Sequence, residues 1–347
     1  MSEPHEARLW KPLKDNSVQC RLCSHFCAIA EGARGKCGVR ENRSGTLRTL
    51  VYALPAAVNV DPVEKKPLYH FLPGTQTFSF GTMGCNMDCA FCQNAQLSQP
   101  PRHGHPIRGT RTEPADLVRA AQDSGCRSIS YTYSEPTIFF ELVEDTARLA
   151  RAKGLRNILV TNGFMSPECL DALGPSPQNG SGLIQAANVD LKAFTEDFYS
   201  TVCGARLAPV LDNLKHMRAL GWWLEVTTLV IPGANDSPAE LSALAAWIAA
   251  DLGPDTPWHL SRFHPEHRMP DRPPTPPETL LAARALGLSA GLRHVYIGNL
   301  SGPGFGDTLC PACHAPAVSR SGFSADRSGL SHGRCAACGA ALAGVWE

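Results

Sequence analysis

Short apolar runs alternate with amphipathic stretches between residues 75 and 300 of this chain. A short continuous apolar run bounded by turn residues is typical of a buried strand, and apolar residues that recur every three or four positions are typical of a helix. The pattern predicts strands over 77–82, 127–133, 157–163, 186–192, 223–231, 258–263 and 293–299, and helices over 116–124, 138–153, 209–220, 238–252 and 277–290.

Start and stop residues support this division. Pro114 precedes the first predicted helix, and Gly125 and Gly154 follow the first two, as expected because proline favours a first turn and glycine a helix end. Strands separated by helices imply an α/β fold with a parallel sheet and right-handed crossovers. We expect a partial or nearly closed TIM-like (β/α) barrel, with a doubly wound open sheet as the alternative. Functional groups then collect at the carboxyl ends of the strands.

Cysteines divide the chain into three parts. Of 14 cysteines in 347 residues, all but Cys126, Cys169 and Cys203 fall into three compact groups. The three isolated ones are predicted to be small buried residues. The chain is expected to contain an N-terminal cysteine-rich metal-binding segment (1–74), a barrel (75–306) and a C-terminal zinc-ribbon-like or rubredoxin-like module (307–347).

Charge and hydropathy narrow the function classes. The formal net charge is zero and the pI is about 7.2, so nothing in the charge balance favours nucleic acid or an anionic membrane as a partner. The first 19 residues lack the apolar core of a signal peptide, and no apolar run approaches the ~20 residues of a membrane span. We therefore expect a cytoplasmic protein, in which clustered cysteines act as metal ligands rather than disulfides.

The central cysteine group follows the first predicted strand with the spacing Cys-x3-Cys-x2-Cys, at Cys85, Cys89 and Cys92. A zinc site or an electron-transfer [4Fe–4S] cluster normally takes four protein ligands. Three ligands leave one iron of a cubane open to a small molecule; a zinc loop with a distant fourth ligand is the alternative. The motif resembles that of radical S-adenosylmethionine (SAM) enzymes. The resemblance implies that the open iron binds SAM, that one electron releases a 5′-deoxyadenosyl radical, and that Phe91 lies beside the adenine.

Polar residues end several predicted strands and are candidate SAM contacts. After the second strand, Ser134 and Glu135 stand where radical SAM proteins have a Gly-Gly-Glu-like segment, so Glu135 could meet the methionine amino group; it could also simply begin a helix. After the third strand, Asn162 could bond ribose hydroxyls or neighbouring backbone.

Two later strands add further candidates. Asp190 could also bond ribose, and Lys192 could neutralise the SAM carboxylate, unless the two only pair with each other along one strand face. His264 could contact adenine or ribose, or stabilise a turn, and Pro232-Gly233 form a turn at which backbone could approach the adenine.

Taken together and in order, these motifs closely resemble the AmmeMemoRadiSam-system radical SAM enzymes, relatives of pyruvate formate-lyase activating enzymes. The resemblance implies a SAM-cleaving barrel, a flavodoxin or ferredoxin as reductant, and association with the system's other components; the small-molecule or protein substrate is not implied. Ser134 stands where we expect threonine. The segments that carry the resemblance are CRLCSHFCAIAEGARGKCGVR (20–40), EKKPLYHFLPGT (64–75), TMGCNMDCAFCQN (82–94), SYTYSEPTIF (130–139), VTNGF (160–164), NVDLKAF (188–194), TTLVIPGAND (227–236), WHLSRFHPE (258–266), HVYIGNL (294–300) and GVWE (344–347).

Two other functional classes remain open. One is a protein-activating enzyme that generates a glycyl radical on a partner. The other is a non-catalytic metal-bound scaffold, which would not cleave SAM.

The C-terminal cysteines form two CxxC pairs, Cys310/Cys313 and Cys335/Cys338. Two such pairs are typical of a tetrahedral four-thiolate site. A segment of about 40 residues buries little core, so a metal would supply its folding energy. Structural zinc is predicted; a redox-active single iron or a disulfide switch is the alternative.

The N-terminal cysteines, Cys20, Cys23, Cys27 and Cys37, have the spacing Cys-x2-Cys-x3-Cys-x9-Cys. Zinc or an auxiliary [4Fe–4S] cluster would fit equally, and His25 or His70 could replace one thiolate. A cluster could relay an electron to the catalytic one, whereas zinc would only hold this segment against the barrel.

Overall fold

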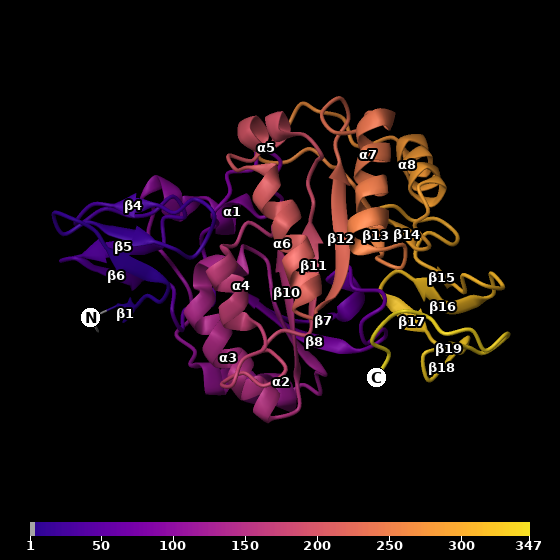
Figure 1. Cartoon of the computed structure of the whole chain (residues 1–347), viewed down its shortest axis with the longest axis horizontal. Coiled ribbons are helices and arrows are strands. Elements are labelled where there is room, and N and C mark those ends of the chain that lie inside the picture. Colours follow the sequence, from indigo (N-terminus) through magenta and orange to yellow (C-terminus); the bar gives the residue numbers. More distant parts are fainter. Residues whose placement is uncertain (1–3) are drawn as a thin grey trace.

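An eight-stranded sheet forms the centre of the structure, a computed structural model that describes residues 4–347 (Figure 1). Its strands, in spatial order, are β14 (Val295–Gly298), β13 (Trp258–Arg262), β12 (Trp223–Val230), β11 (Ala186–Asp190), β10 (Arg156–Thr161), β9 (Ser128–Tyr131), β8 (Gln76–Gly81) and β7 (Ala57–Pro62). Neighbours from β8 to β14 are parallel, and β7 is antiparallel to β8.

Helices connect successive parallel strands. They are α1 (Ala95–Ser98), α2 (Pro114–Asp123), α3 (Phe140–Ala152), α4 (Pro167–Leu173), α5 (Glu196–Val202), α6 (Leu207–Ala219), α7 (Pro238–Trp247) and α8 (Pro277–Ser289). Single 3-10 turns cover Val63–Lys65, Pro100–His103 and Pro136–Phe139, and a π-helical turn, Ile248–Leu252, extends α7.

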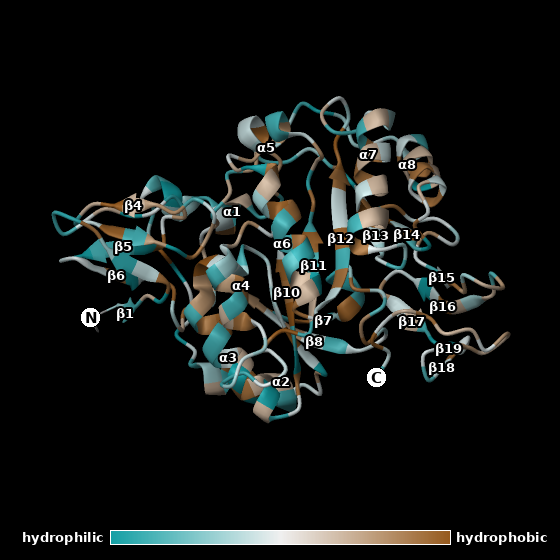
Figure 2. Ribbon diagram, viewed as in Figure 1, coloured by the Kyte–Doolittle hydropathy of each residue, from teal (hydrophilic) through white to brown (hydrophobic). Residues whose placement is uncertain are grey.

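Burial explains the strand pattern. The central strands are coloured largely hydrophobic in Figure 2, whereas the helices carry both hydrophobic and hydrophilic residues. In α3, for example, Leu142, Val143 and Ala147 are buried against the sheet while Lys153, just beyond the helix, is exposed. Apolar runs thus become strands covered on both faces, and one-sided patterns become the covering helices.

The mostly parallel α/β sheet predicted from the sequence is confirmed. Its strands follow one another in chain order from β8 to β14, which differs from a doubly wound sheet, where the strand order reverses at a switch point. The sheet ends at β7 and β14, and closure into a barrel is not seen. Within the central sheet and its connecting α-helices, four elements were not predicted: β7, which lies within the N-terminal segment 1–74, and the short helices α1, α4 and α5.

Two small sheets and their connecting loops, at one end of the molecule, carry the N-terminal cysteines (Figure 1). They are formed by β1 (His5–Glu6), β6 (Thr46–Thr49) and β5 (Arg40–Arg43), and by β2 (Trp10–Pro12), β3 (Val18–Cys20) and β4 (Ala28–Ile29). Backbone hydrogen bonds from Ser24 N to Phe164 O (3.2 Å) and from Ser166 N to Leu22 O (3.2 Å) attach this region to the loop after β10. The fully buried Arg40 also pairs with Glu141 of α3.

The C-terminal module lies at the opposite end of the molecule (Figure 1). Its strands are β15 (Thr308–Leu309), β16 (Pro316–Ser321), β17 (Ser324–Asp326), β18 (Leu330–Ser331) and β19 (Arg334–Cys335). The chain end pairs with the segment after β7: Leu72 N donates to Val345 O and Val345 N to His70 O, both at 2.7 Å. The module is therefore fixed to the barrel by backbone bonds. Within residues 4–347, no helix has the length and apolar character needed to cross a bilayer.

Candidate active site

A cleft of about 1130 Å³ opens at the carboxyl ends of the parallel strands. Residues that follow β8, β9, β10, β11 and β14 line it, as do residues within β12 and β13. The segment around Tyr69 and residues 320–323 of the C-terminal module complete the lining. Because parallel strands bring their carboxyl ends to one edge, positions far apart in sequence meet here. Among the residues singled out from the sequence, those that line the cleft are Cys85, Cys89, Phe91, Cys92, Ser134, Glu135, Asn162, Asp190 and Lys192.

The three central cysteines lie at one side of this cleft. Their spacing differs from that of a single-metal site: across residues 4–347, the C-terminal thiols are the only group of three or more potential ligands whose atoms all lie within 4.8 Å of one another. At least one pair of sulfur atoms among Cys85, Cys89 and Cys92 is therefore more than 4.8 Å apart, wider than the ~3.8 Å between thiolates of one zinc. The set fits a polynuclear cluster in which each thiolate binds its own iron.

The loop that carries these cysteines is held from several sides. Arg102 donates to the carbonyl oxygens of Cys85 (3.2 Å) and Met87 (3.1 Å). Asp88 N donates to Cys203 O (2.9 Å). Gly84 precedes the loop with φ +103°, and a Cβ there would lie 2.7 Å from Val39 Cγ1, so only glycine fits. These contacts hold the backbone of the cysteine loop in place.

Cys203 has a contact that its isolated place in the sequence did not indicate. Its buried thiol hydrogen-bonds Cys89, and this bond, assisted by the charge of Lys192, lowers the pKa of Cys89. Cys203 is fully buried and is not among the residues lining the cleft. It therefore supports Cys89 from behind and leaves the cleft side of the cysteine triad open.

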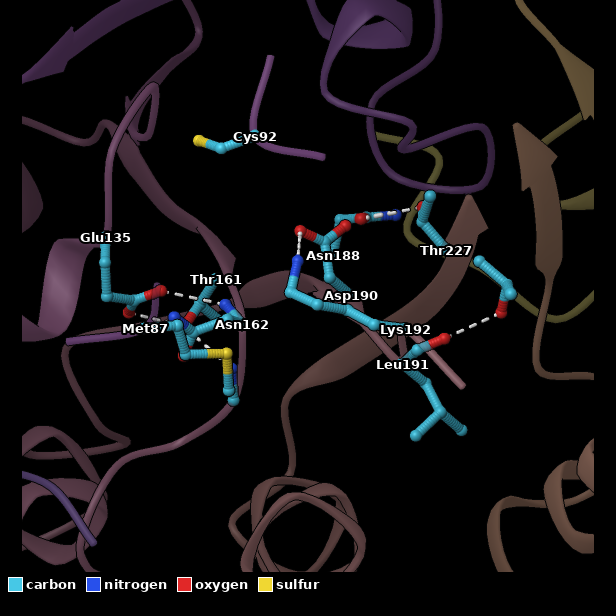
Figure 3. Close-up of polar contacts among 12 residues, drawn as sticks. Met87, Cys92, Glu135, Thr161, Asn162, Asn188, Asp190, Leu191, Lys192 and Thr227 are labelled. Carbon is cyan, nitrogen blue, oxygen red and sulfur yellow. Dashed lines mark hydrogen bonds and ion pairs between the residues drawn. The ribbon is translucent and has the colours of Figure 1, made fainter. Parts of the chain in front are cut away.

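Glu135 is a fully buried carboxylate whose oxygens are already engaged by the chain. It accepts hydrogen bonds from Thr137 N (3.0 Å), Thr161 Oγ1 (2.7 Å) and Asn162 N (2.8 Å), and Figure 3 shows the last two side by side. The first bond caps the 3-10 turn that begins at Pro136. Burial raises the pKa of Glu135, and these donors oppose the rise. Glu135 thus ties the ends of β9 and β10 together at the edge of the cleft.

Asn162 connects β10 to the cysteine loop. Its Nδ2 donates to Asn86 Oδ1 (2.8 Å) and lies 3.8 Å from Cys85 Sγ, while its Oδ1 accepts from Phe164 N (3.0 Å). The side chain therefore orients Cys85 through its neighbour Asn86.

Asp190 and Lys192 form the i,i+2 pair that the sequence allowed, with 2.9 Å between Oδ2 and Nζ (Figure 3). The Lys192 ammonium also lies 5.6 Å from the centre of the Phe91 ring. Burial alone would lower the pKa of Lys192, but Asp190 and Cys89 hold it well above its usual value. A permanent cation therefore lies between the cysteine loop and the carboxyl end of β11.

The remaining two candidates differ in position. Ser134 lines the cleft, and its buried Oγ has no hydrogen-bond partner among residues 4–347. His264 has an exposed side chain and lies outside the residues that line the cleft.

The other side of the cleft holds polar residues that the sequence reading did not single out. Lys66 pairs with Asp61 (2.6 Å), which also accepts a hydrogen bond from Tyr133 OH (2.6 Å). Burial raises the pKa of Asp61, but these donors outweigh it and hold that pKa below its usual range. The segment 64–75 entered only through the family resemblance; its two lysines beside an apolar stretch were the available signal.

A buried histidine–carboxylate pair lies further along the same side. His259 Nε2 is 2.7 Å from Glu225 Oε2, and Glu225 also accepts from the backbone of Tyr69 (2.9 Å) and His70 (2.8 Å). Burial would raise the pKa of Glu225, but the hydrogen bond and charge of His259 lower it to about 2. A carboxylate in this position orients the imidazole that faces the cleft.

The C-terminal module contributes Arg320 to the cleft. Its guanidinium lies 4.1 Å from the centre of the Tyr69 ring, and Nη2 donates to Tyr69 O (2.6 Å). The side chain is nearly fully buried, 3.8 Å from Glu64. The module thus forms part of the cleft wall.

The two cysteine groups outside the cleft have different arrangements. Cys310 Sγ lies 3.7 Å from Cys338 Sγ, and Cys313 Sγ lies 3.6 Å from Cys335 Sγ, close to the spacing of a tetrahedral four-thiolate site. The N-terminal set Cys20, Cys23, Cys27 and Cys37 lines a separate small cavity. His25 lines that cavity too, whereas both ring nitrogens of His70 bond elsewhere, to Ala343 O (2.8 Å) and Tyr296 OH (2.7 Å).

Comparison with known proteins agrees with this geometry. The family model of the radical SAM superfamily matches residues 80–245, from β8 into α7. The chain is 42% identical over 336 residues to the uncharacterized protein MJ0808 of Methanocaldococcus jannaschii, covering 96% of this chain and 97% of that protein.

More distant similarities cover the barrel. The chain is 26% identical over 136 residues to the benzylsuccinate synthase activating enzyme of Thauera aromatica, 39% of each chain. Among solved structures, a radical SAM methyltransferase from Sphaerobacter thermophilus aligns with a TM-score of 0.50 at 18% identity, over 65% of this chain and 67% of that one. The structural likeness extends to the fold alone.

Proposed function

Because this chain belongs to the radical SAM superfamily, we propose that it is an enzyme whose Cys85, Cys89 and Cys92 hold a [4Fe–4S] cluster with one open iron. When bound, that cluster supplies the electron that cleaves SAM to a 5′-deoxyadenosyl radical, which acts on a substrate in the same cleft. The observation that carries the proposal is three thiols, spaced too widely for one zinc, at one side of a large cleft.

The residues that line the cleft beside the three thiols are suited to hold SAM. Lys192 offers a cation for the methionine carboxylate, and Phe91 beside it offers an aromatic face for the adenine. Asp190, half-exposed at the strand end, is available to ribose hydroxyls. Glu135 and Asn162 act mainly by positioning, since their polar atoms are used within the chain.

The opposite side of the cleft would receive the substrate. His259, oriented by Glu225, lines that side together with Lys66 and Arg320, two buried cations paired with Asp61 and Glu64. This combination favours a polar substrate with acceptor or anionic groups.

We extend the proposal to the biological setting. The ordered motifs of the sequence support membership of the AmmeMemoRadiSam system, with a flavodoxin or ferredoxin as electron donor and a cytoplasmic location, where thiols stay reduced. Zinc is the proposed metal of the C-terminal thiols, supported by their close spacing.

A second candidate function is the activation of a partner protein by forming a glycyl radical. The similarity to benzylsuccinate synthase activating enzyme favours it. Deuterium tracing separates the two: label passing from a small molecule into 5′-deoxyadenosine supports the first function, and label passing from a glycine of a protein supports the second.

The direct test is the release of 5′-deoxyadenosine from SAM. Anaerobically reconstituted protein reduced with dithionite should release it, and Cys89→Ala should reduce release to background. Cys126→Ala, which removes a buried cysteine outside all three groups, is the matched control and should stay active. Retained release in Cys89→Ala would refute the ligand assignment.

A further inference from the structure

Four cysteines surround the small cavity in the N-terminal region. Cys20 and Cys37 are buried, Cys23 and Cys27 are half-buried, and all four line the cavity together with Arg40. They come from β3, from the loop between β3 and β4, and from the turn before β5. The fold therefore brings the complete N-terminal group to one place.

The spacing of these thiols distinguishes them from the C-terminal set. The four C-terminal sulfur atoms all lie within 4.8 Å of one another; within the described residues 4–347, no three N-terminal thiols do. A single zinc would hold its thiolates about 3.8 Å apart. The N-terminal set shares with the catalytic cysteines the lack of three thiols within this limit, which suits thiolates that each bind a different metal of one cluster.

The cavity is also equipped for a negatively charged group. Arg40 is fully buried; its Nη1 lies 3.4 Å from Cys20 Sγ, and its Nε, also buried, has no hydrogen-bond partner in the described chain. Backbone N–H groups of His25, Lys36 and Val39 donate to the sulfur atoms of Cys23, Cys27 and Cys37. Such N–H···S bonds and a nearby cation stabilise cluster-bound thiolates and help to set their reduction potential.

The cavity adjoins the catalytic loop. Asn86 follows Cys85 directly and also lines the N-terminal cavity. His25, two residues after Cys23, is 2.8 Å from Asn86 O through its Nε2, and a carbonyl acceptor requires that this nitrogen carries the proton. One hydrogen bond and three peptide links thus connect a ligand of the N-terminal set to a ligand of the catalytic set.

We propose that Cys20, Cys23, Cys27 and Cys37 bind a second [4Fe–4S] cluster, in electronic contact with the catalytic cluster through His25 and Asn86. The electronic contact between the clusters depends on the proposed function, which places the catalytic cluster; the presence of the second cluster does not depend on it. In the transfer step the second cluster loses one electron and the catalytic cluster gains it, and a one-electron donor such as dithionite, flavodoxin or ferredoxin re-reduces the second cluster.

Counting iron, acid-labile sulfide and zinc in a variant without the catalytic ligands tests the cluster. The triple variant C85A/C89A/C92A, reconstituted anaerobically, should retain about half of the wild-type iron and sulfide, and its reduced electron paramagnetic resonance (EPR) signal should not respond to SAM. The sulfide count distinguishes a cubane from a single iron bound by the C-terminal thiols, because a single-iron site contains no acid-labile sulfide. Sulfide at background, with two zinc ions per chain, would overturn the proposal.

A complementary variant removes two N-terminal ligands and leaves too few thiolates for a cubane. C23A/C27A should lower iron and sulfide by about half and leave the SAM-responsive EPR signal, whereas the control Cys126→Ala should keep the full content. In the wild type, with both clusters reduced, spin–spin coupling should broaden the signals, and each variant should lose that broadening. Full sulfide in C23A/C27A would contradict the ligand set, and unbroadened wild-type signals would contradict the electronic contact. If the wild type does not cleave SAM while the triple variant keeps half of the sulfide, the proposed function is refuted and the second cluster is not.

Discussion

Lys192 lines the cleft and already pairs with Asp190, so the carboxylate of a bound ligand would be a second anion beside its ammonium group. Its Nζ is 2.9 Å from Asp190 and its own side chain is 11% exposed, so a second anion approaching from the cleft would be only partly screened by water. Lys192→Met should weaken SAM binding roughly 10- to 100-fold, as expected for the loss of a charge-assisted hydrogen bond. Anaerobic equilibrium dialysis measures this directly.

Lys192→Arg is the matched control for that experiment. It keeps the charge and should bind SAM within a few-fold of the wild type. If Lys192→Met binds SAM as tightly as the wild type, the carboxylate is held elsewhere and Lys192 only pairs with Asp190.

At the residue scale, site residues could be predicted from the sequence where they belong to a motif of fixed spacing or end a predicted strand. The Cys-x3-Cys-x2-Cys motif and the polar strand ends at Glu135, Asn162 and Lys192 all reach the cleft. Cys203 was predicted only as a buried residue, because its contact with Cys89 depends on how the turn after α5 packs against the cysteine loop. No local pattern records such a contact between residues more than a hundred positions apart.

At the scale of elements, periodicity located the parallel strands to within a few residues, since buried runs and turn residues are local features. It missed β7 (Ala57–Pro62), where burial does not follow hydropathy: Val58 and Val60 are exposed and Asp61 is buried. It missed α4 and α5, which have seven residues each and are too short to show a helical period. Whether the barrel closes depends on sheet curvature, which hydropathy does not encode.

The C-terminal module should depend on its metal. Its small hydrophobic cluster includes the predicted ligands Cys310 and Cys335 together with Leu342 and Trp346. Loss of the metal should therefore loosen the packing of this cluster and destabilise the module. Cys335→Ala should release one zinc and make residues 307–347 sensitive to limited proteolysis, while the iron content stays at the wild-type level.

Mass spectrometry of the proteolytic fragments gives the result. Loss of iron with an intact C-terminal module would show that these cysteines serve the clusters and are not a separate structural site.

For the whole molecule, the junction of barrel and C-terminal module predicts sensitivity to acid. His294 is 3% exposed, its Nε2 has no partner within residues 4–347, and its ring lies 4.3 Å from that of His70. Burial lowers the pKa of His294 to about 4. The unfolded chain takes up this proton near pH 6.5 and the folded chain does not, so stability is full above about pH 6.5 and falls as the pH drops toward 4.

Urea unfolding under anaerobic conditions at pH 7.5 and 5.5 measures this loss. His294→Gln cannot be protonated and should lose about 1 kcal/mol less stability than the wild type over this interval. An equal loss in both proteins would show that the His294 ring takes up its proton in the folded state.

The central claim is that three cysteines bind a cubane and leave one iron free for SAM. Electron–nuclear double resonance on the reduced protein, with SAM labelled with ¹⁵N at the methionine amino group, tests it most directly. A strong hyperfine coupling between the cluster and the labelled nitrogen, absent in Cys89→Ala, is the predicted result. A SAM-responsive cluster with no coupling to the label, or with its fourth iron bound by a protein side chain, would contradict the account.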